Sequence, residues 1–508
     1  MDDDLPTDFQ VIVVGTGMVE SIVAAACSRI RKNVLHMDSS DHYGGLWASY
    51  NFDGLQKFIK EVNSDPKKQV QVYNLSEKWY IEKESPELEN KDEENKTDDS
   101  KSEQVKKVWS QASFATEYRK FNIDMTPKLL FSRGPLVELL ISSNIARYAE
   151  FRCVTRVLTW LDDRLMPVPC SRADVFATEA VSIVEKRMLM KMLTSIVGYN
   201  EEEMNNEFKD WESKTFKEYL EHKGLTPNLI HYVLYAIAGG TNAMPCLEGV
   251  KECKKFLMSL GRYGNTPFLW PMYGSGELPQ CFCRLCAVFG GVYCLNRPID
   301  KVATKTIDEG KNMITIDSKS KTLNCEHLVI GINECPKELL STESVESCDI
   351  SKAVFITNGS IMKSDKEPLT LLRFPPLAEG DNTVTVLEVG PATGSCPKGL
   401  FVVYFITNKV KDAETDLKPY AERIFDMSGG DQTEATEKPK CLWSLFCNLK
   451  DTSAPVASVA AGVHVCSGPD AGLDFDRAVL QVHSTPPQRL LYVQSDSSGY
   501  SVTLCSAT

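Results

Sequence analysis

The chain has 508 residues, more than one hydrophobic core usually holds, so we expect two domains or one large composite domain. Hydrophobic residues make up 43% of the chain, and the net charge is −13 with no basic stripe. This charge argues against a nucleic-acid-binding protein. The first residues are acidic and no apolar run follows them, so we expect no secretory signal and a cytoplasmic protein.

The first elements in chain order read as a strand, a helix and a second strand. Residues 10–14 are apolar and β-branched, residues 21–29 form a helix of small residues, and residues 33–37 form the next strand. The sequence GTGMVE, at residues 15–20, follows the first strand. It resembles the Gly-x-Gly-x-x-Gly motif of dinucleotide-binding folds. Glu20 replaces the third glycine and puts a carboxylate where a pyrophosphate would dock, so we predict that no flavin binds.

Other parts of a flavoprotein outline follow at the expected places. Asp38 ends the second strand, where an acid would bind a ribose, and Tyr43-Gly44-Gly45 comes next, as in FAD amine oxidases. Residues 465–470 are similar to the strand that closes an FAD site. These pieces predict an α/β, flavoprotein-like composite domain, a degenerate FAD-binding fold. A flavin-dependent oxidoreductase stays open as an alternative.

The middle of the chain differs in composition. Residues 84–107 are acidic and polar, and we expect a disordered insertion there because they cannot bury enough apolar surface. Helices are predicted at residues 178–197 and 229–238. The first has apolar residues on more than one face, as in a helix that is buried between neighbours or lines an apolar cleft. We therefore predict a mostly helical domain at 122–235, inserted into a composite α/β domain of residues 1–121 and 236–480.

Short alternating runs after Gly290 predict strands. They lie at 292–295, 313–316, 327–330, 354–357, 402–407 and 464–466. Cys281, Cys283 and Cys286 form the one dense group of cysteines, but no second pair of ligands lies at suitable spacing. We interpret these thiols as structural and expect no metal site.

Several segments are similar to the Rab escort / Rab GDP-dissociation inhibitor family. They are residues 14–17, 34–38, 43–45, 121–124, 143–148, 261–264 and 273–280, with Arg284 and Gly290-Gly291. Residues 169–176 and 184–190 and the acidic insertion resemble the escort branch, and the inhibitor branch is the alternative. The resemblance implies a non-catalytic protein without a cofactor. It would bind GDP-loaded Rab GTPases, present them to the Rab geranylgeranyl transferase heterodimer, and carry the lipidated product to membranes in transient contact.

The resemblance also implies roles for particular residues. The Rab-binding positions would be Tyr43, Gly44, Gly45, Glu277, Arg284, Val292 and Cys294. An internal ion pair is the alternative role for Glu277 and Arg284. The transferase contact maps to Phe176 and Arg187, although Phe176 could instead serve as a hydrophobic staple of the following helix.

The lipid site and the end of the chain are less defined. For the geranylgeranyl chain, the apolar pattern of the helical domain offers Leu136, Leu139, Leu140, Met188 and Met192. Ordinary core packing explains the same pattern equally well. The last 28 residues, 481–508, depart from the family, because Thr485-Pro486-Pro487 interrupts the amphipathic helix expected there.

Overall fold

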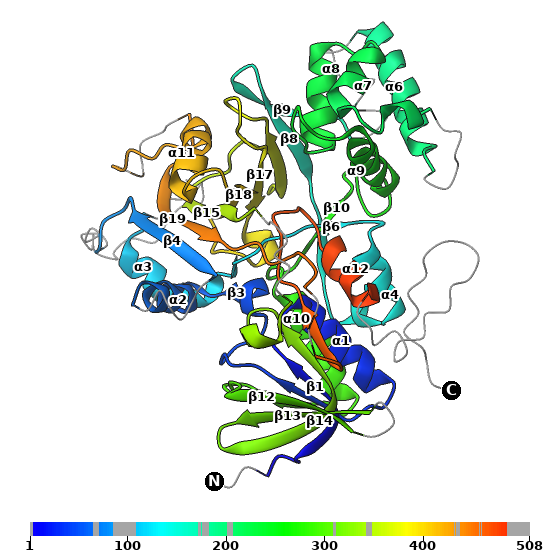
Figure 1. Ribbon diagram of the computed structural model, residues 1–508. Coiled ribbons are helices and arrows are strands. Elements are labelled where there is room, and N and C mark those ends of the chain that lie inside the picture. The colour runs from blue at the N-terminus through cyan, green and yellow to red at the C-terminus, as the bar shows by residue number, and fades with distance from the viewer. Residues whose placement is uncertain are drawn as a thin grey trace.

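The computed structural model describes most of the chain. The described residues are 4–64, 71–84, 108–170, 174, 182–200, 207–307, 311–341, 348–430, 432, 437–456, 458 and 460–484. The predicted insertion, from residue 85, and the tail beyond residue 484 lie outside them. Figure 1 shows three parts: a small sheet with its helices at the bottom, a larger sheet in the middle, and a group of helices at the top right.

The first sheet has the order β11-β2-β1-β14-β13-β12, with β20 beside β14. Its strands are β1 (Asp8–Val14), β2 (Val34–Met37), β11 (Val292–Cys294), β12 (Lys301–Ile307), β13 (Lys311–Ser318), β14 (Lys321–Gly331) and β20 (Val463–Cys466). Strands β11, β2, β1, β14 and β20 are parallel, as the predicted strand–helix–strand unit requires. One face packs against four helices, α1 (Met18–Arg29), α4 (Pro135–Ser142), α10 (Glu277–Val288) and α12 (Asp476–Ser484).

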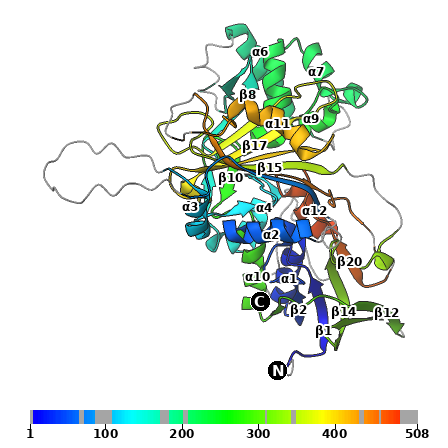
Figure 2. The same cartoon turned by 90° about the vertical axis from the view of Figure 1, so that its left-hand side faces the viewer.

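The second sheet has the order β4-β19-β15-β18-β17-β16-β8-β9. Its strands are β4 (Val72–Trp79), β8 (Arg156–Leu161), β9 (Arg164–Pro167), β15 (Ile350–Thr357), β16 (Thr370–Phe374), β17 (Val384–Val389), β18 (Phe401–Asn408) and β19 (Cys441–Leu449). Helix α11 (Ala413–Ile424) packs on one face, and α2 (Phe52–Ser64) with α3 (Gln111–Thr116) packs on the other. Figure 2 shows this sheet edge-on between its helices.

Short strands join the two sheets. Strand β3 (Ser49–Tyr50) pairs with β5 (Ile123–Asp124), and β10 (Phe268–Pro271) lies between β6 (Leu130–Phe131) and β7 (Phe151–Cys153). Lys128, between β5 and β6, is fully buried and donates to the backbone carbonyls of Asp470 and Gly472 at 3.0 and 2.5 Å. This lysine therefore holds the segment between β20 and α12 against the middle of the molecule.

The helical part consists of α6 (Ile183–Val197), α7 (Phe216–His222), α8 (Pro227–His231), the π-helix η5 (Tyr232–Ile237) and α9 (Cys246–Ser259). These helices share one apolar core. Helix α6 begins with a capping box, in which Ser182 and Glu185 each accept a hydrogen bond from the other's backbone N–H.

The boundaries 122–235 of the helical domain are wrong at both ends. Residues 123–167 carry strands, and β8 pairs with β16 of the second sheet, while α9 packs with α6 and α7. The six strands predicted after residue 290 coincide with β11, β13, β14, β15, β18 and β20.

Among the described residues, no helix combines the length and the apolar character needed to cross a bilayer.

Candidate functional site

The glycine loop after β1 is filled by the side chain of Glu20. Its carboxyl group lies beside Gly15, Gly17 and Gly331, and a Cβ at Gly17 would be 2.6 Å from Oε2. Burial raises the pKa of Glu20 to about 8. Its Oε2 has no hydrogen-bond partner among the described residues. The cavity that remains is about 50 Å³, far below the ~300 Å³ or more of a typical ligand site.

Asp38, the acid predicted to bind a ribose, instead accepts hydrogen bonds from another residue of the protein. Oδ2 of Asp38 accepts hydrogen bonds from the backbone N–H and the hydroxyl of Thr16 at 2.8 and 2.6 Å. The backbone N–H of Gly44, which has a φ of 104°, donates to the same hydroxyl oxygen at 2.8 Å. The residues at this site therefore do not fit a flavin dinucleotide. They form a closed network that fixes the loop of Tyr43, Gly44 and Gly45.

Two of the predicted Rab-binding residues lie on one side of α10. Glu277 and Arg284 are seven residues apart, which is about two helical turns or ~10.5 Å. Both are described and no ion pair joins them, so the alternative of an internal pair is wrong. Arg284 is exposed, and its guanidinium lies 5.1 Å from the centre of the Tyr148 ring. Glu277 is half-buried, and burial, with a smaller effect of Asp124, raises its pKa.

The predicted positions on β11 lie on the other face of the first sheet. Successive side chains of a strand point to opposite faces. Tyr293 points toward α1 and α10, where its ring lies 6.0 Å from that of Tyr43 and its hydroxyl 3.0 Å from His36 Nδ1. Val292 and Cys294 pack instead into the core on the opposite face. The structure thus brings Tyr43 and α10 together, and separates Val292 and Cys294 from them.

An open polar groove runs beside Tyr43. Its volume is about 880 Å³, and Tyr43, Gly45 and Gln280 are among the residues that line it. Gln280 lies one turn after Glu277 on α10, so the groove and the exposed side of α10 form one surface. We call this surface, with Tyr43, Gly45, Glu277, Gln280 and Arg284, the platform.

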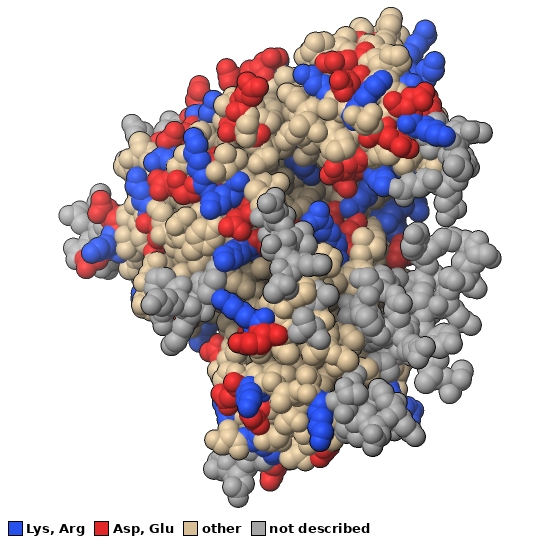
Figure 3. Space-filling view, viewed as in Figure 1, with Lys and Arg blue, Asp and Glu red and all other residues tan. Residues whose placement is uncertain are grey.

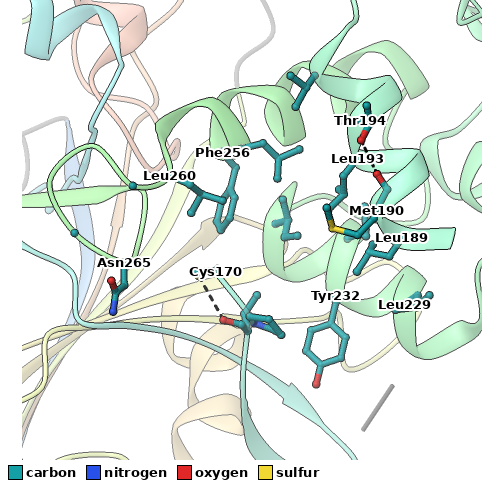
Figure 4. Close-up of a pocket in the computed structure, with 18 residues that line it drawn as sticks. Cys170, Leu189, Met190, Leu193, Thr194, Leu229, Tyr232, Phe256, Leu260 and Asn265 are labelled. Atoms are coloured by element: carbon teal, nitrogen blue, oxygen red, sulfur yellow. Dashed lines mark hydrogen bonds between the residues drawn. The ribbon is translucent and has the colours of Figure 1, made fainter. Parts of the chain in front are cut away.

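The helical part contains an apolar cavity of about 540 Å³. Helix α6 contributes Leu189, Leu193 and Val197, and α9 and the residue after it contribute Phe256 and Leu260 from the opposite side (Figure 4). The other lining residues are Val168, Pro169, Cys170, Met190, Thr194, Leu229, Tyr232, Val233, Ile237, Leu257, Gly261, Gly264 and Asn265. The hydroxyl of Thr194 is already satisfied by the carbonyl of Met190 at 2.8 Å. The cavity therefore suits a long apolar ligand.

None of the five residues predicted for lipid binding, all of them described, lines this cavity. Leu136, Leu139 and Leu140 are each 2% exposed and pack against α1, α10 and α12 in the core of the first sheet. Met192 is 3% exposed in the core of the helical part, and Met188 lies beside Gly224. These five side chains therefore pack within the protein. Of the two alternatives predicted for the helix at 178–197, burial between neighbours or an apolar cleft, both apply to parts of α6: Met192 and Ile196 are buried, and Leu189, Leu193 and Val197 line the cavity.

The structure describes one of the two predicted transferase contacts, Arg187. Phe176 lies outside the described residues. Arg187 is exposed on the first half of α6, next to Ile183 and Val184, which are 72% and 66% exposed. The alternative role of Phe176, a hydrophobic staple, lies outside the described residues as well.

The fold and the filled glycine loop define a flavoprotein-like protein without a competent dinucleotide site. Among solved structures, a Rab GDI from Plasmodium falciparum is similar, with a TM-score of 0.65, 18% identity and coverage of 94% of this chain and 98% of that one. An oxidoreductase from Methanosarcina mazei is also similar, with a TM-score of 0.56, 11% identity, and coverage of 94% and 99%. At these identities both show the fold alone.

The family follows from the sequence comparisons. The model of the family described as GDP dissociation inhibitor matches residues 1–82 and 100–422, and the chain belongs to this family. Human Rab proteins geranylgeranyltransferase component A 1 is 36% identical, over 95% of this chain and 91% of its own length. Mouse component A 2 is 34% identical over 95% and 96%. The Rab GDP-dissociation inhibitor of Saccharomyces cerevisiae is 29% identical over 83% of each.

Proposed function

We propose that this protein is a Rab escort protein. It binds GDP-loaded, unprenylated Rab GTPases, presents them to Rab geranylgeranyl transferase, and carries the prenylated product to membranes. The relatives named component A of that transferase support the assignment, since they match over 95% of the chain. The structural observation that carries it is the apolar cavity of about 540 Å³ in a chain whose dinucleotide site is filled.

The platform is the proposed contact for the GTPase. Arg284 is exposed and has an aromatic ring rather than a carboxylate beside it, so its charge is available to a partner. Tyr43 is half-buried and held by Tyr293, so its ring is fixed before binding. Val292 and Cys294 are also proposed for Rab binding from the resemblance, but they would act from the other face of the sheet.

The apolar cavity is the proposed site for the geranylgeranyl chain, in place of the five residues first proposed. Each buried CH₂ of a lipid gains roughly 0.8 kcal/mol, so an apolar cavity could hold a prenylated cysteine firmly. Leu193 on α6 lies across it from Phe256 and Leu260, and Val197 also lines it. The lipid would therefore lie between α6 and α9.

The transferase would dock on the start of α6. Arg187, Ile183 and Val184 form an exposed surface there, and an arginine beside apolar side chains is a common anchor at protein interfaces. Phe176 remains part of this proposal through the resemblance. The protein itself would supply no catalytic group, because the prenyl transfer belongs to the transferase, and it would work in the cytosol.

A Rab GDP-dissociation inhibitor is the alternative from the same family. A flavin-dependent oxidoreductase is not supported, because the residues around Glu20 do not fit the cofactor. The proposal is tested by gel filtration of the purified protein with an unprenylated Rab, loaded with GDP or with a GTP analogue. We expect a complex with the GDP form. No complex with either form would contradict the proposal.

A further inference from the structure

Exposed arginine, tyrosine and aliphatic side chains gather beside the apolar cavity. We name them the arginine face, which consists of Arg133, Ile141, Arg147, Tyr148, Arg262 and Tyr263. Ile141, Tyr148 and Tyr263 are 46%, 48% and 49% exposed, and Arg133 and Arg147 are exposed as well. Tyr148 also lies beside Arg284 of the platform, and none of the roles proposed above uses the other five residues.

Contacts between the elements hold the arginine face together. Arg262, in the turn between α9 and β10, donates to the carbonyl of Ser132 at 2.8 Å and pairs with Glu138 of α4 at 2.5 Å. Its guanidinium also lies 5.2 Å from the centre of the Tyr263 ring. Ile141 follows Glu138 by three residues, so it lies one turn along the same side of α4. The turn and the outer side of α4 therefore form one surface.

The arginine face adjoins the lining of the cavity. Gly261 and Gly264, which flank Arg262 and Tyr263 in the chain, both line the cavity. The sulfur of Cys153 lies 3.0 Å from the carbonyl oxygen of Tyr263, which fixes the turn from its other side. A lipid that entered or left the cavity at this turn would therefore pass next to these arginines.

The charge of this surface is opposite to that of the whole protein. Arg133 and Arg147 form no ion pair with any described residue, although the chain has a net charge of −13. Glu138 is the only acidic residue in the sequence of α4 and of η3 (Ile145–Arg147), and Arg262 neutralises it. On the face shown in Figure 3, acidic and basic residues are interspersed.

We propose that the arginine face docks on an anionic lipid bilayer and so brings the cavity close to the membrane surface. Basic side chains are attracted by the negative potential of such a surface, and tyrosine is favoured at the boundary between headgroups and acyl chains. The proposal deepens the proposed function, and rests on it only for the identity of the lipid in the cavity.

Sedimentation of the intact protein with vesicles tests this proposal. We expect binding to phosphatidylcholine vesicles that contain about one third phosphatidylserine, and much weaker binding to pure phosphatidylcholine. The double variant Arg133→Glu/Arg147→Glu should bind the anionic vesicles at least ~10-fold more weakly. The control Arg119→Glu/Lys301→Glu makes the same change of charge at exposed positions near α3 and in β12, away from α4 (Figure 1), and should bind like the wild type.

The outcomes separate this proposal from the function proposed above. If the double variant binds anionic vesicles as the wild type does, or if the control loses as much binding, the arginine face is not the docking surface. Rab binding is measured on the same samples, without vesicles. A double variant that keeps vesicle binding but loses binding of GDP-loaded Rab would assign the arginine face to the GTPase. A wild-type protein that binds vesicles but no Rab would overturn only the escort function.

Discussion

The carboxyl group of Glu20 packs against Gly17, where an added Cβ would lie 2.6 Å from Oε2 of Glu20. In a dinucleotide-binding loop, the glycine at this place lets the backbone approach a pyrophosphate. Here the same free space holds an acid side chain from the first turn of α1. The loop beside the platform is therefore filled by a side chain of the protein and needs no bound nucleotide.

The protein should purify without flavin. Glu20 fills the loop and the remaining cavity of about 50 Å³ is too small, so added FAD should also fail to bind. Visible absorbance and gel filtration after incubation with FAD measure this. Stoichiometric FAD that stays with the protein would show that the loop is still competent.

Glu20→Gln should stabilise the protein more at high pH than at low pH. The pKa of Glu20 is raised from 4.5 to about 8 by burial, so the folded state keeps a proton that the unfolded chain loses between these values. Stability then falls by about 1.4 kcal/mol per pH unit across this window and levels off above it. A glutamine at this position is neutral at every pH, so the variant does not lose stability in this way as the pH rises.

Thermal unfolding at pH 5 and pH 8 checks this expectation. The gain in midpoint of Glu20→Gln over the wild type should be clearly larger at pH 8. Glu379→Gln, at an exposed position, is the matched control and should show no difference between the two pH values. An equal gain for Glu20→Gln at both pH values would mean that this carboxyl group is ionised in the fold.

Arg284→Ala should weaken binding of GDP-loaded Rab by about 2 kcal/mol, as expected for an arginine at the centre of an interface. The unfolding midpoint should hardly change, because Arg284 is exposed and forms no ion pair with any described residue. Calorimetric titration gives the affinity, with Arg119→Ala as the control on a distant exposed arginine. Unchanged Rab affinity would remove Arg284 from the platform.

Val197→Trp should reduce binding of geranylgeranylated Rab toward the level of the unprenylated protein. Val197 is 40% exposed and lines the cavity, so an indole there would obstruct the lipid. A loss of at least ~10-fold is expected for the prenylated form only, since each excluded CH₂ forfeits binding energy. Lys191→Trp, exposed on the same helix but not in the cavity lining, is the control. Equal losses for both variants would place the lipid elsewhere.

The sequence allowed the first sheet to be predicted well, because strand, glycine loop and helix follow one another within residues 8–37. It did not locate the cavity. Met188 and Met192 have the same spacing as Leu189 and Leu193. A shift of one residue turns a side chain by about 100° around a helix. Only the packing of α7, α8 and α9 therefore shows which side of α6 lines the cavity. The sequence places the leucines of α4 in the helical domain, because the pairing of β8 with β16 cannot be seen from the sequence.

Transferase docking separates an escort protein from an inhibitor. Phe176→Ala and Arg187→Ala should each leave Rab affinity intact, because Arg187 lies on α6, away from the platform on α10. Each should slow prenylation at limiting transferase, by at least ~10-fold for Phe176→Ala. Excess transferase should restore the rate, since only assembly is impaired. Normal prenylation at low transferase would show that these residues are not the contact.

The central claim is tested most directly by the initial rate of geranylgeranyl transfer to a Rab in a mixture of purified transferase, GDP-loaded Rab and geranylgeranyl diphosphate. The rate should be negligible without this protein and should rise with its concentration up to that of the Rab. A protein that binds the Rab but leaves it unprenylated, or extracts only prenylated Rab, would be an inhibitor, and the escort function would be contradicted.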